Sequence, residues 1–281
     1  MTKPFIIDVH GHIGATKGFR AHFHSPSEMV GVMDSMGVEI LMFVSMGLLS
    51  QQLQLGYDEA MAALDSHPDR FRAYTVFDPG WPDVSMRHIE KYQDRPGFVG
   101  IKIHPAIHAV PPEDPRYADL WDYANSRGLV VLTHSWSPDP ANPNQDLSTP
   151  DRFAAVLESR PKLRLILGHC GGRVVGIQRA AELMRRFPNC WADISGDTLS
   201  LGQLEWTVAQ AGGDRLLFGT DCNWIEPRYH LGRLLKADLP AETKMRILRT
   251  NAEDVFGAAL LSPDGAGPKW PSAPGPSDQL K

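Results

Sequence analysis

The chain alternates short apolar runs with longer segments in which apolar residues recur at helical spacing. Most of the short runs lack a strict alternation of polar and apolar residues, which predicts strands buried on both faces. These runs are Phe5–Val9, Ile40–Val44, Phe71–Phe77, Phe98–Ile103, Val130–Thr133, Leu163–Leu167, Cys190–Ile194 and Leu216–Gly219. The predicted helices are Ser27–Met36, Asp58–Ser66, Ser85–Asp94, Pro115–Ser126, Thr149–Ser159, Val174–Phe187, Leu201–Ala211 and a final hairpin, Tyr229–Lys236 with Pro240–Phe256. This order predicts repeated βα units.

Polar side chains follow the ends of several predicted strands. They are His10 and His12 (PFIIDVHGH), Lys102 and His104 (GIKIHP), His134 (VVLTH), His169 (LILGH) and Asp221 (LLFGTD). An open doubly wound sheet binds its ligand at a switch point between a few strand ends, whereas a closed barrel gathers all strand ends at one face. The sequence therefore predicts a (β/α)8 TIM barrel with a metal site at the C-terminal ends of its strands.

Length and composition are typical of one globular domain. The chain has 281 residues, 42% of them hydrophobic, so we expect a single barrel over residues 1–258. Residues 259–281 are rich in Pro, Gly and Ser and are expected to form a disordered tail.

Charge and cysteine content narrow the classes of partner. A net charge of −5 without a run of Lys or Arg gives no footprint for nucleic acid or an anionic membrane, so a small-molecule substrate is expected. The sequence shows no signal-peptide core, no apolar run of membrane-spanning length and no CxxC motif. These features predict a cytoplasmic protein and exclude a cysteine-rich zinc site.

The two His-x-His pairs differ in context. His10 and His12 end a predicted strand, where alternate side chains share a face and both imidazoles can point into the barrel. His22 and His24 lie in the loop segment GFRAHFHSPS, where surface or substrate-loop histidines are the better interpretation. We therefore expect the first pair, and not the second, to bind metal.

The remaining candidate ligands are supported by the position they share, just after a predicted strand. A lone histidine after a strand, such as His134 or His169, is usually a hydrogen-bonded core residue, but here the position recurs. A buried carboxylate at Asp221 needs a metal, an arginine or an imidazole as partner. His10, His12, His134 and Asp221 suit one divalent metal, with Zn²⁺ the first expectation and Mn²⁺ or Fe²⁺ as alternatives.

Such a site predicts water chemistry. A divalent metal lowers the pKa of water toward neutrality and so supplies a hydroxide nucleophile. Asp221 is then the candidate general base as well as a ligand.

Other candidates are less constrained by the pattern. Lys102 can bridge a second metal if carbamylated, bind a substrate carboxylate, or pair with a buried acid such as Asp8, and the last two readings are favoured. His104 is expected to hydrogen-bond to the ligands. Candidate cations for a substrate carboxylate also include Arg20 and Arg173, although for Arg173, at a helix start, a solvated side chain is the favoured interpretation. Aromatic residues in the loops after the strands suggest a planar substrate: Phe19, Phe23, Trp136 and Trp224.

These motifs together resemble the amidohydrolase superfamily, in particular its amidohydrolase-related branch, which includes aminocarboxymuconate semialdehyde decarboxylase. The resemblance extends from IDVHGH through GIKIHP, LTHS, LILGHCGG and LLFGTDCNW to the closing NAEDVFG. It implies a distorted (β/α)8 barrel, one metal on His10, His12, His134 and Asp221, and His169 as the residue that orients water or polarises the substrate. It also implies that a homodimer is a common assembly.

The resemblance leaves three functions open. The first is hydrolysis of an amide, ester or lactone in a small, planar or carboxylated substrate, with Asp221 as base and Asp221 or His169 as proton donor to the leaving group. The second is non-oxidative decarboxylation of an aromatic or muconate-like acid on the same metal site. The third is a catalytically silent metal-binding barrel. The short first loop favours hydrolysis.

Overall fold

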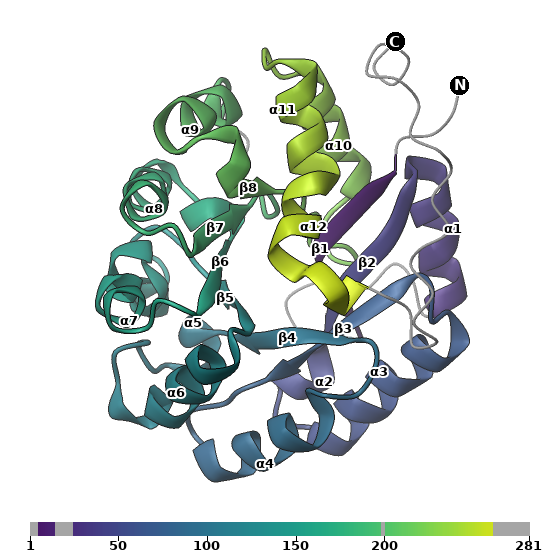
Figure 1. The fold of residues 1–281 in the computed structure, drawn as a ribbon, viewed down its shortest axis with the longest axis vertical. Coiled ribbons are helices and arrows are strands. Elements are labelled where there is room, and N and C mark those ends of the chain that lie inside the picture. The colour runs from purple at the N-terminus through teal and green to yellow at the C-terminus, as the bar shows by residue number, and fades with distance from the viewer. Residues whose placement is uncertain (1–4, 15–24, 198–199, 261–281) are drawn as a thin grey trace.

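The predicted barrel is confirmed by the computed structural model, which describes residues 5–14, 25–197 and 200–260. Its strands form one sheet in the order β1 to β8, each parallel to the next (Figure 1). They are β1 (Ile6–Ile13), β2 (Val38–Ser45), β3 (Phe71–Val76), β4 (Phe98–Ile103), β5 (Val130–His134), β6 (Arg164–Gly168), β7 (Cys190–Asp193) and β8 (Leu216–Leu217). Nearly every strand residue is buried, which explains the unbroken apolar runs in the sequence.

Backbone hydrogen bonds bring the last strand to the first. The Val9 amide donates to the Phe218 carbonyl at 2.9 Å, and the Asp221 amide donates to the His10 carbonyl at 2.8 Å. An isolated parallel bridge joins Gly11 and Cys222. The segment after β8 therefore runs beside the end of β1, where both contribute to the candidate site.

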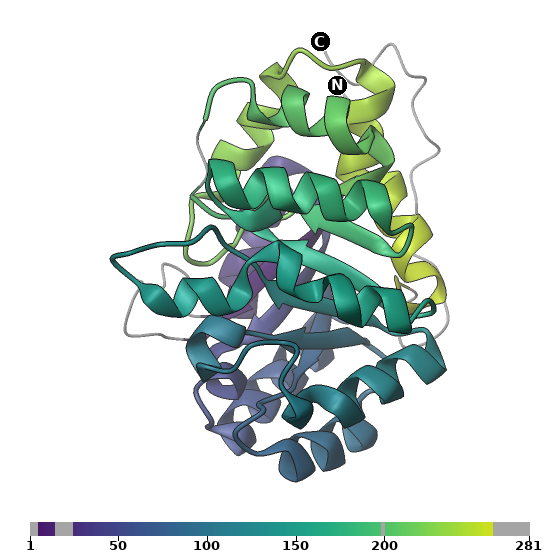
Figure 2. The ribbon, with the colours of Figure 1, turned by 90° about the vertical axis from the view of Figure 1, so that its left-hand side faces the viewer.

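Helices surround the strands (Figures 1 and 2). They are α1 (Pro26–Met36), α2 (Met46–Leu49), α3 (Leu53–Ser66), α4 (Pro82–Tyr92), α5 (Pro105–His108), α6 (Ala118–Arg127), α7 (Ala154–Ser159), α8 (Val174–Arg186), α9 (Gln203–Ala211), α10 (Pro227–Lys236), α11 (Ala241–Met245) and α12 (Asn251–Phe256). A π-helical turn, Arg246–Thr250, joins α11 to α12. Figure 2 shows helices of the second half of the chain lying one above another over the sheet.

Two features of the helices differ from the prediction. Helix α3 begins at Leu53, before the predicted start at Asp58. Asp58 lies inside the helix, where its carboxylate accepts a hydrogen bond from the Gln54 side chain at 2.8 Å. The short helices α2 and α5 were not predicted, since four residues give no periodic pattern.

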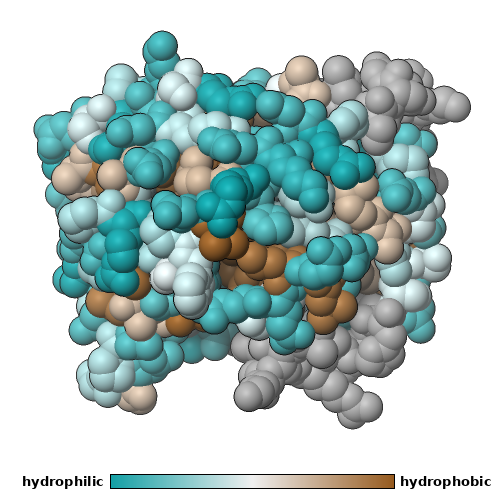
Figure 3. All heavy atoms as spheres, turned by 90° about the horizontal axis from the view of Figure 1, so that it is seen from below, coloured by the Kyte–Doolittle hydropathy of each residue, from teal (hydrophilic) through white to brown (hydrophobic). Residues whose placement is uncertain are grey.

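One face of the molecule is shown in space-filling form in Figure 3. It is largely hydrophilic, and apolar residues gather near its centre. Every helix in the described ranges falls short of the length or apolar character that a membrane span requires. Leu260 closes a 3-10 helix, Gly257–Leu260, and is buried in the core; residues 261–281 of the predicted tail lie outside the described residues.

Candidate active site

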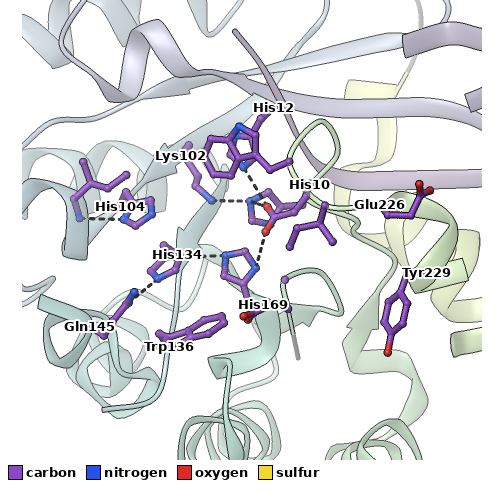
Figure 4. Close-up of a pocket in the computed structure, with 16 residues that line it drawn as sticks. His10, His12, Lys102, His104, His134, Trp136, Gln145, His169, Glu226 and Tyr229 are labelled. Carbon is purple, nitrogen blue, oxygen red and sulfur yellow. Dashed lines mark hydrogen bonds and ion pairs between the residues drawn. The ribbon is translucent and has the colours of Figure 1, made fainter. Parts of the chain in front are cut away.

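The strand ends converge on one cavity of about 620 Å³ (Figure 4). His10 and His12 leave β1 on the same side because one residue, Gly11, separates them. A side chain at Gly11 would place a Cβ only 2.7 Å from the Cys222 carbonyl oxygen, so the close approach of the two segments requires glycine. The cavity is lined by His10, His12, Lys102, His104, Ile107, His134, Trp136, Gln145, His169, Gly196, Asp197, Asp221, Trp224, Ile225, Glu226 and Tyr229.

One carboxylate faces three imidazoles at the floor of this cavity. Oδ1 of Asp221 lies 3.2 Å from His12 Nε2 and 3.4 Å from His10 Nε2. Oδ2 of Asp221 lies 3.5 Å from His169 Nδ1. All four side chains are buried, so these polar groups interact in a poorly solvated environment.

The backbone at two of these residues is held in the left-handed region. His169 and Asp221 both have φ of 61°, which is uncommon for residues other than glycine and costs of order 1 kcal/mol. His169 directly follows β6, and Asp221 lies four residues after the end of β8. In both residues this conformation accompanies a side chain that lines the cavity. Strain of this kind is concentrated at functional sites in proteins.

His134 lies beside the group rather than within it. Its Nδ1 is 3.1 Å from His169 Nε2, and its Nε2 is 2.8 Å from Gln145 Oε1. His10, His12 and Asp221 form a group whose possible ligand atoms all lie within 4.8 Å of one another, and His134 is not among them. The role of His134 as third histidine ligand stays a prediction.

His104 and Lys102 contact the site in ways that the sequence did not indicate. The His104 ring stacks on His134 with ring centroids 4.1 Å apart, and its Nδ1 accepts a hydrogen bond from the Ile107 amide. His104 therefore supports His134 by stacking and not by the expected hydrogen bond. Nζ of Lys102, fully buried, lies 3.0 Å from His10 Nε2.

The suggested pairing of Lys102 with Asp8 is not observed. Both oxygens of Asp8 are engaged elsewhere, by the Thr220 hydroxyl and amide and by the His10 amide. Asp8 thus fixes the segment that leads from β8 to Asp221, and Lys102 is left facing the cavity.

Aromatic side chains form part of the cavity wall. The Trp224 indole stacks on His12 with centroids 3.9 Å apart and an interplanar angle of 6°. Trp136 lies nearly parallel to His134 at 5.9 Å. Arg173 is not among the lining residues: its side chain is 55% exposed, lies over Trp136 and pairs with Asp197 at 2.9 Å. The solvated reading of Arg173 fits this position better than a carboxylate clamp does.

Asp193 and Ser195 are site residues that the sequence analysis missed. Asp193 ends β7 and is fully buried, with Oδ2 2.8 Å from His10 Nδ1. Ser195 Oγ lies 2.8 Å from His169 Nδ1. The signal was present, because Asp193 is a polar residue at the end of an apolar run, as Asp221 is.

The charge states of the group follow from burial and from mutual contacts. Burial lowers the pKa of His12 to about 4, against the opposing effect of Asp221, and it also lowers the pKa of His169 to about 4. Burial alone would raise the pKa of Asp221, but the neighbouring imidazoles outweigh it and hold that pKa well below the usual range. Burial lowers the pKa of Lys102 to about 8. At neutral pH the imidazoles of His12 and His169 are therefore neutral and the Asp221 carboxylate is ionised.

This donor set fits a divalent cation. Imidazole nitrogen with carboxylate oxygen is a ligand set used by Zn²⁺, Mn²⁺ and Fe²⁺. The three side chains of His10, His12 and Asp221 come from β1 and from the segment after β8, which the barrel closure holds together.

The chain belongs to the amidohydrolase family, whose model matches residues 7–258. This assignment confirms the resemblance to the amidohydrolase-related branch, an enzyme family that uses divalent metals. No curated protein matches the chain significantly.

Solved structures show the same fold at low sequence identity. An uncharacterised TIM-barrel protein from Bordetella bronchiseptica aligns with a TM-score of 0.74 and 18% identity, over 91% of this chain and 99% of that one. A dihydroxybenzoic acid decarboxylase from a Polaromonas species, with bound manganese and an inhibitor, aligns at 0.70 and 16%, over 91% and 97%. A 4-oxalomesaconate hydratase from Rhodopseudomonas palustris aligns at 0.66 and 20%, over 91% and 97%.

The first loop cannot be compared with the prediction. Phe19, Arg20, His22, Phe23 and His24 lie outside the described residues.

Proposed function

We propose that this protein is a metal-dependent hydrolase that attacks a carbonyl group of a small, planar or carboxylated substrate. The observation that carries the proposal is the position of Asp221, whose two carboxylate oxygens face His10, His12 and His169 on the floor of a cavity. A carboxylate in this position can act both as a ligand and as a base toward a water molecule.

The residues divide into two sets by their contacts. His10, His12 and Asp221 would hold the cation, with His134 as the further ligand expected from the family. Zn²⁺ is the proposed metal, and the manganese in the Polaromonas decarboxylase supports Mn²⁺ as the alternative. When bound, a divalent cation lowers the pKa of water and polarises a carbonyl oxygen.

Proton transfer is assigned to side chains of this chain. Asp221 takes a proton from the attacking water, because its carboxylate is ionised at neutral pH. His10 and His12 face Oδ1 of Asp221, whereas Nδ1 of His169 lies 3.5 Å from the other oxygen, Oδ2. His169 can pass a proton to the leaving group. Lys102 has no acidic partner in direct contact among the described residues and is placed to donate a hydrogen bond to a substrate oxygen.

The cavity limits the size and shape of the substrate. A volume of about 620 Å³ suits a small molecule, and the Trp136 and Trp224 indoles provide flat apolar surfaces on which a planar group can stack. This supports a ring-bearing or conjugated substrate over an extended polar one.

The test is product analysis with the metal-loaded protein. Aromatic amides, esters and lactones are incubated with the Zn²⁺ and Mn²⁺ forms, and incorporation of solvent oxygen-18 into the carboxylic product is followed by mass spectrometry. Hydrolysis places one solvent oxygen in the product. Metal binding without turnover of any substrate in such a panel would favour a catalytically silent barrel.

Decarboxylation is the second candidate, favoured by the aromatic cavity walls and by the dihydroxybenzoic acid decarboxylase among the structural neighbours. Here the cation would anchor the acid, and a protein group would protonate the ring carbon as the carboxyl group leaves. Release of carbon dioxide from aromatic or muconate-like acids, without oxygen incorporation, distinguishes this reaction from hydrolysis.

A further inference from the structure

The carboxylate of Asp193 contacts two residues of the site, the His10 side chain and the His169 backbone amide. Its Oδ2 lies 2.8 Å from Nδ1 of His10. Its Oδ1 accepts three hydrogen bonds, from the His169 amide at 2.9 Å, the Ser195 amide at 3.0 Å and the Ser195 hydroxyl at 2.6 Å. Asp193 is fully buried and is not among the residues that line the cavity. With His10 and His169 it forms a second group whose possible ligand atoms all lie within 4.8 Å of one another.

The hydrogen bonds of Asp193 determine which nitrogen of His10 carries a proton. An ionised carboxylate only accepts hydrogen bonds, so His10 must donate to it from Nδ1. The lone pair of His10 is then on Nε2, which faces the cavity. Lys102 gives an independent indication of the same tautomer, because its ammonium group, which only donates, lies 3.0 Å from that Nε2.

The protonated nitrogen of His169 is determined in the same way, through Ser195. The single hydroxyl proton of Ser195 is committed to Asp193 at 2.6 Å, so Ser195 Oγ can only accept a hydrogen bond from His169 Nδ1 at 2.8 Å. His169 therefore carries its proton on Nδ1 and has its lone pair on Nε2. That nitrogen lies 3.1 Å from His134 Nδ1, which donates to it, and a half-turn of the Gln145 amide then provides a donor for His134 Nε2.

From this geometry we infer that Asp193 is a positioning residue that holds both His10 and His169 as Nδ1–H tautomers, directly at His10 and through Ser195 at His169. The inference rests on the proposed function only in that His10 is taken as a metal ligand. A histidine whose second nitrogen is held by a carboxylate is a better and better-oriented ligand. One buried carboxylate thus fixes the tautomer of both imidazoles, with the lone pair on Nε2 of His10 and on Nε2 of His169.

The tautomers can be read directly in the metal-free protein. Long-range ¹⁵N–¹H correlation spectra separate Nδ1–H from Nε2–H imidazoles, and His10→Gln and His169→Gln variants assign the two signals. We expect both residues to be Nδ1–H in the wild-type chain. An Nε2–H form of either residue overturns the inference, whatever the reaction proves to be.

Two variants test the role of Asp193 in metal binding. In Asp193→Asn the amide oxygen is expected to replace Oδ1, where three donors converge, so that the amide NH₂ faces His10 and moves its proton to Nε2. Zn²⁺ affinity, measured by calorimetry, should then fall about 10- to 100-fold. Ser195→Ala leaves the Asp193–His10 contact in place, so the His10 tautomer should persist and the loss of affinity should be smaller, while the His169 signal loses its fixed tautomer.

The outcomes separate this inference from the proposed function. An Asp193→Asn protein that keeps the Nδ1–H form of His10 and the wild-type Zn²⁺ affinity contradicts the inference. If Asp193→Asn fails to fold, the wild-type and Ser195→Ala spectra decide. A wild-type chain that binds no Zn²⁺ or Mn²⁺ contradicts the proposed function, and the spectra of the metal-free protein still decide the tautomers.

Discussion

The carboxylate of Asp221 lies 3.2 Å from Nε2 of His12, although 209 residues separate the two positions in the chain. Closure of the barrel produces this contact, because hydrogen bonds join the segment after β8 to the end of β1. Each residue alone is weak evidence for a metal site, but the fold brings the two into one group of possible metal ligands.

Replacing Asp221 with Asn should abolish most turnover while the fold is retained. The amide fills the same space but cannot accept the proton of water, and loss of a general base typically reduces the rate by about 10²- to 10⁴-fold. The measurement is kcat on the substrate found by product analysis, together with the melting temperature. The matched control is Asp122→Asn on α6, whose carboxylate is 72% exposed, far more than that of Asp221. Substantial residual turnover in Asp221→Asn would show that another group is the base.

The strands were the most predictable part of the fold. The predicted strand Phe98–Ile103 agrees with β4 at both ends, and the others differ by a few residues, because strands buried on both faces leave unbroken apolar runs. The short helices α2 and α5 left no such pattern. Their existence depends on tertiary packing, which a local reading of four residues does not contain.

For the candidate site, the sequence correctly predicted which residues share one cavity, but it did not predict all of the hydrogen bonds that these residues form. The five strand ends do converge on one cavity, as barrel geometry requires. Asp193 was missed because the predicted strand ran on to Ile194 and so placed Asp193 inside the strand, whereas β7 ends at Asp193. The contact of Lys102 with His10 in place of Asp8 depends on side-chain direction across the barrel, which spacing along one strand does not determine.

Replacing His12 with Ala should sharply reduce metal content, whereas His24→Ala should have little effect. His12 contributes an imidazole to the group around Asp221, and its removal leaves two of the three clustered ligand side chains. Both proteins are purified without added metal and analysed by plasma mass spectrometry for metal per chain, with about one expected in the wild type. Equal losses in the two variants would contradict the choice between the two His-x-His pairs.

Replacing Gly168 with Ala should disturb the site, because the added methyl group would press against the His10 ring. An alanine Cβ there would lie 2.7 Å from the Thr133 carbonyl oxygen and 3.1 Å from His10 Cε1. Overpacking of this kind destabilises proteins by about 1–3 kcal/mol, and displacement of His10 should also weaken metal binding. The measurements are denaturant unfolding and Zn²⁺ calorimetry.

The control for Gly168→Ala is Gly232→Ala in α10. A Cβ at Gly232 meets no described atom within 4 Å, so the substitution should stabilise the fold by about 0.4–1 kcal/mol through the unfolded chain. Similar stability changes in the two variants would show that the space behind His10 is not as tight as the structure indicates.

His230 on α10 should make the fold sensitive to acid. It is fully buried, both ring nitrogens lack hydrogen-bond partners among the described residues, and burial lowers its pKa from 6.5 to about 4. Because the unfolded chain takes up this proton at a higher pH than the folded chain does, the free energy of unfolding decreases as the pH falls from about 6.5 toward 4. The full contribution over this interval is about 3 kcal/mol.

The measurement is the difference in unfolding free energy between the wild type and His230→Leu as a function of pH. His12 and His169 also have lowered pKa values and add to the acid sensitivity of both proteins, so the difference between the two isolates His230. Leucine fills the site without a titrating group, and the variant should therefore gain stability relative to the wild type as the pH falls below about 6.5, with the gain levelling off near pH 4. A difference that stays constant over this range would mean that His230 takes up its proton equally well in the folded chain, and hence that its ring is solvated or paired.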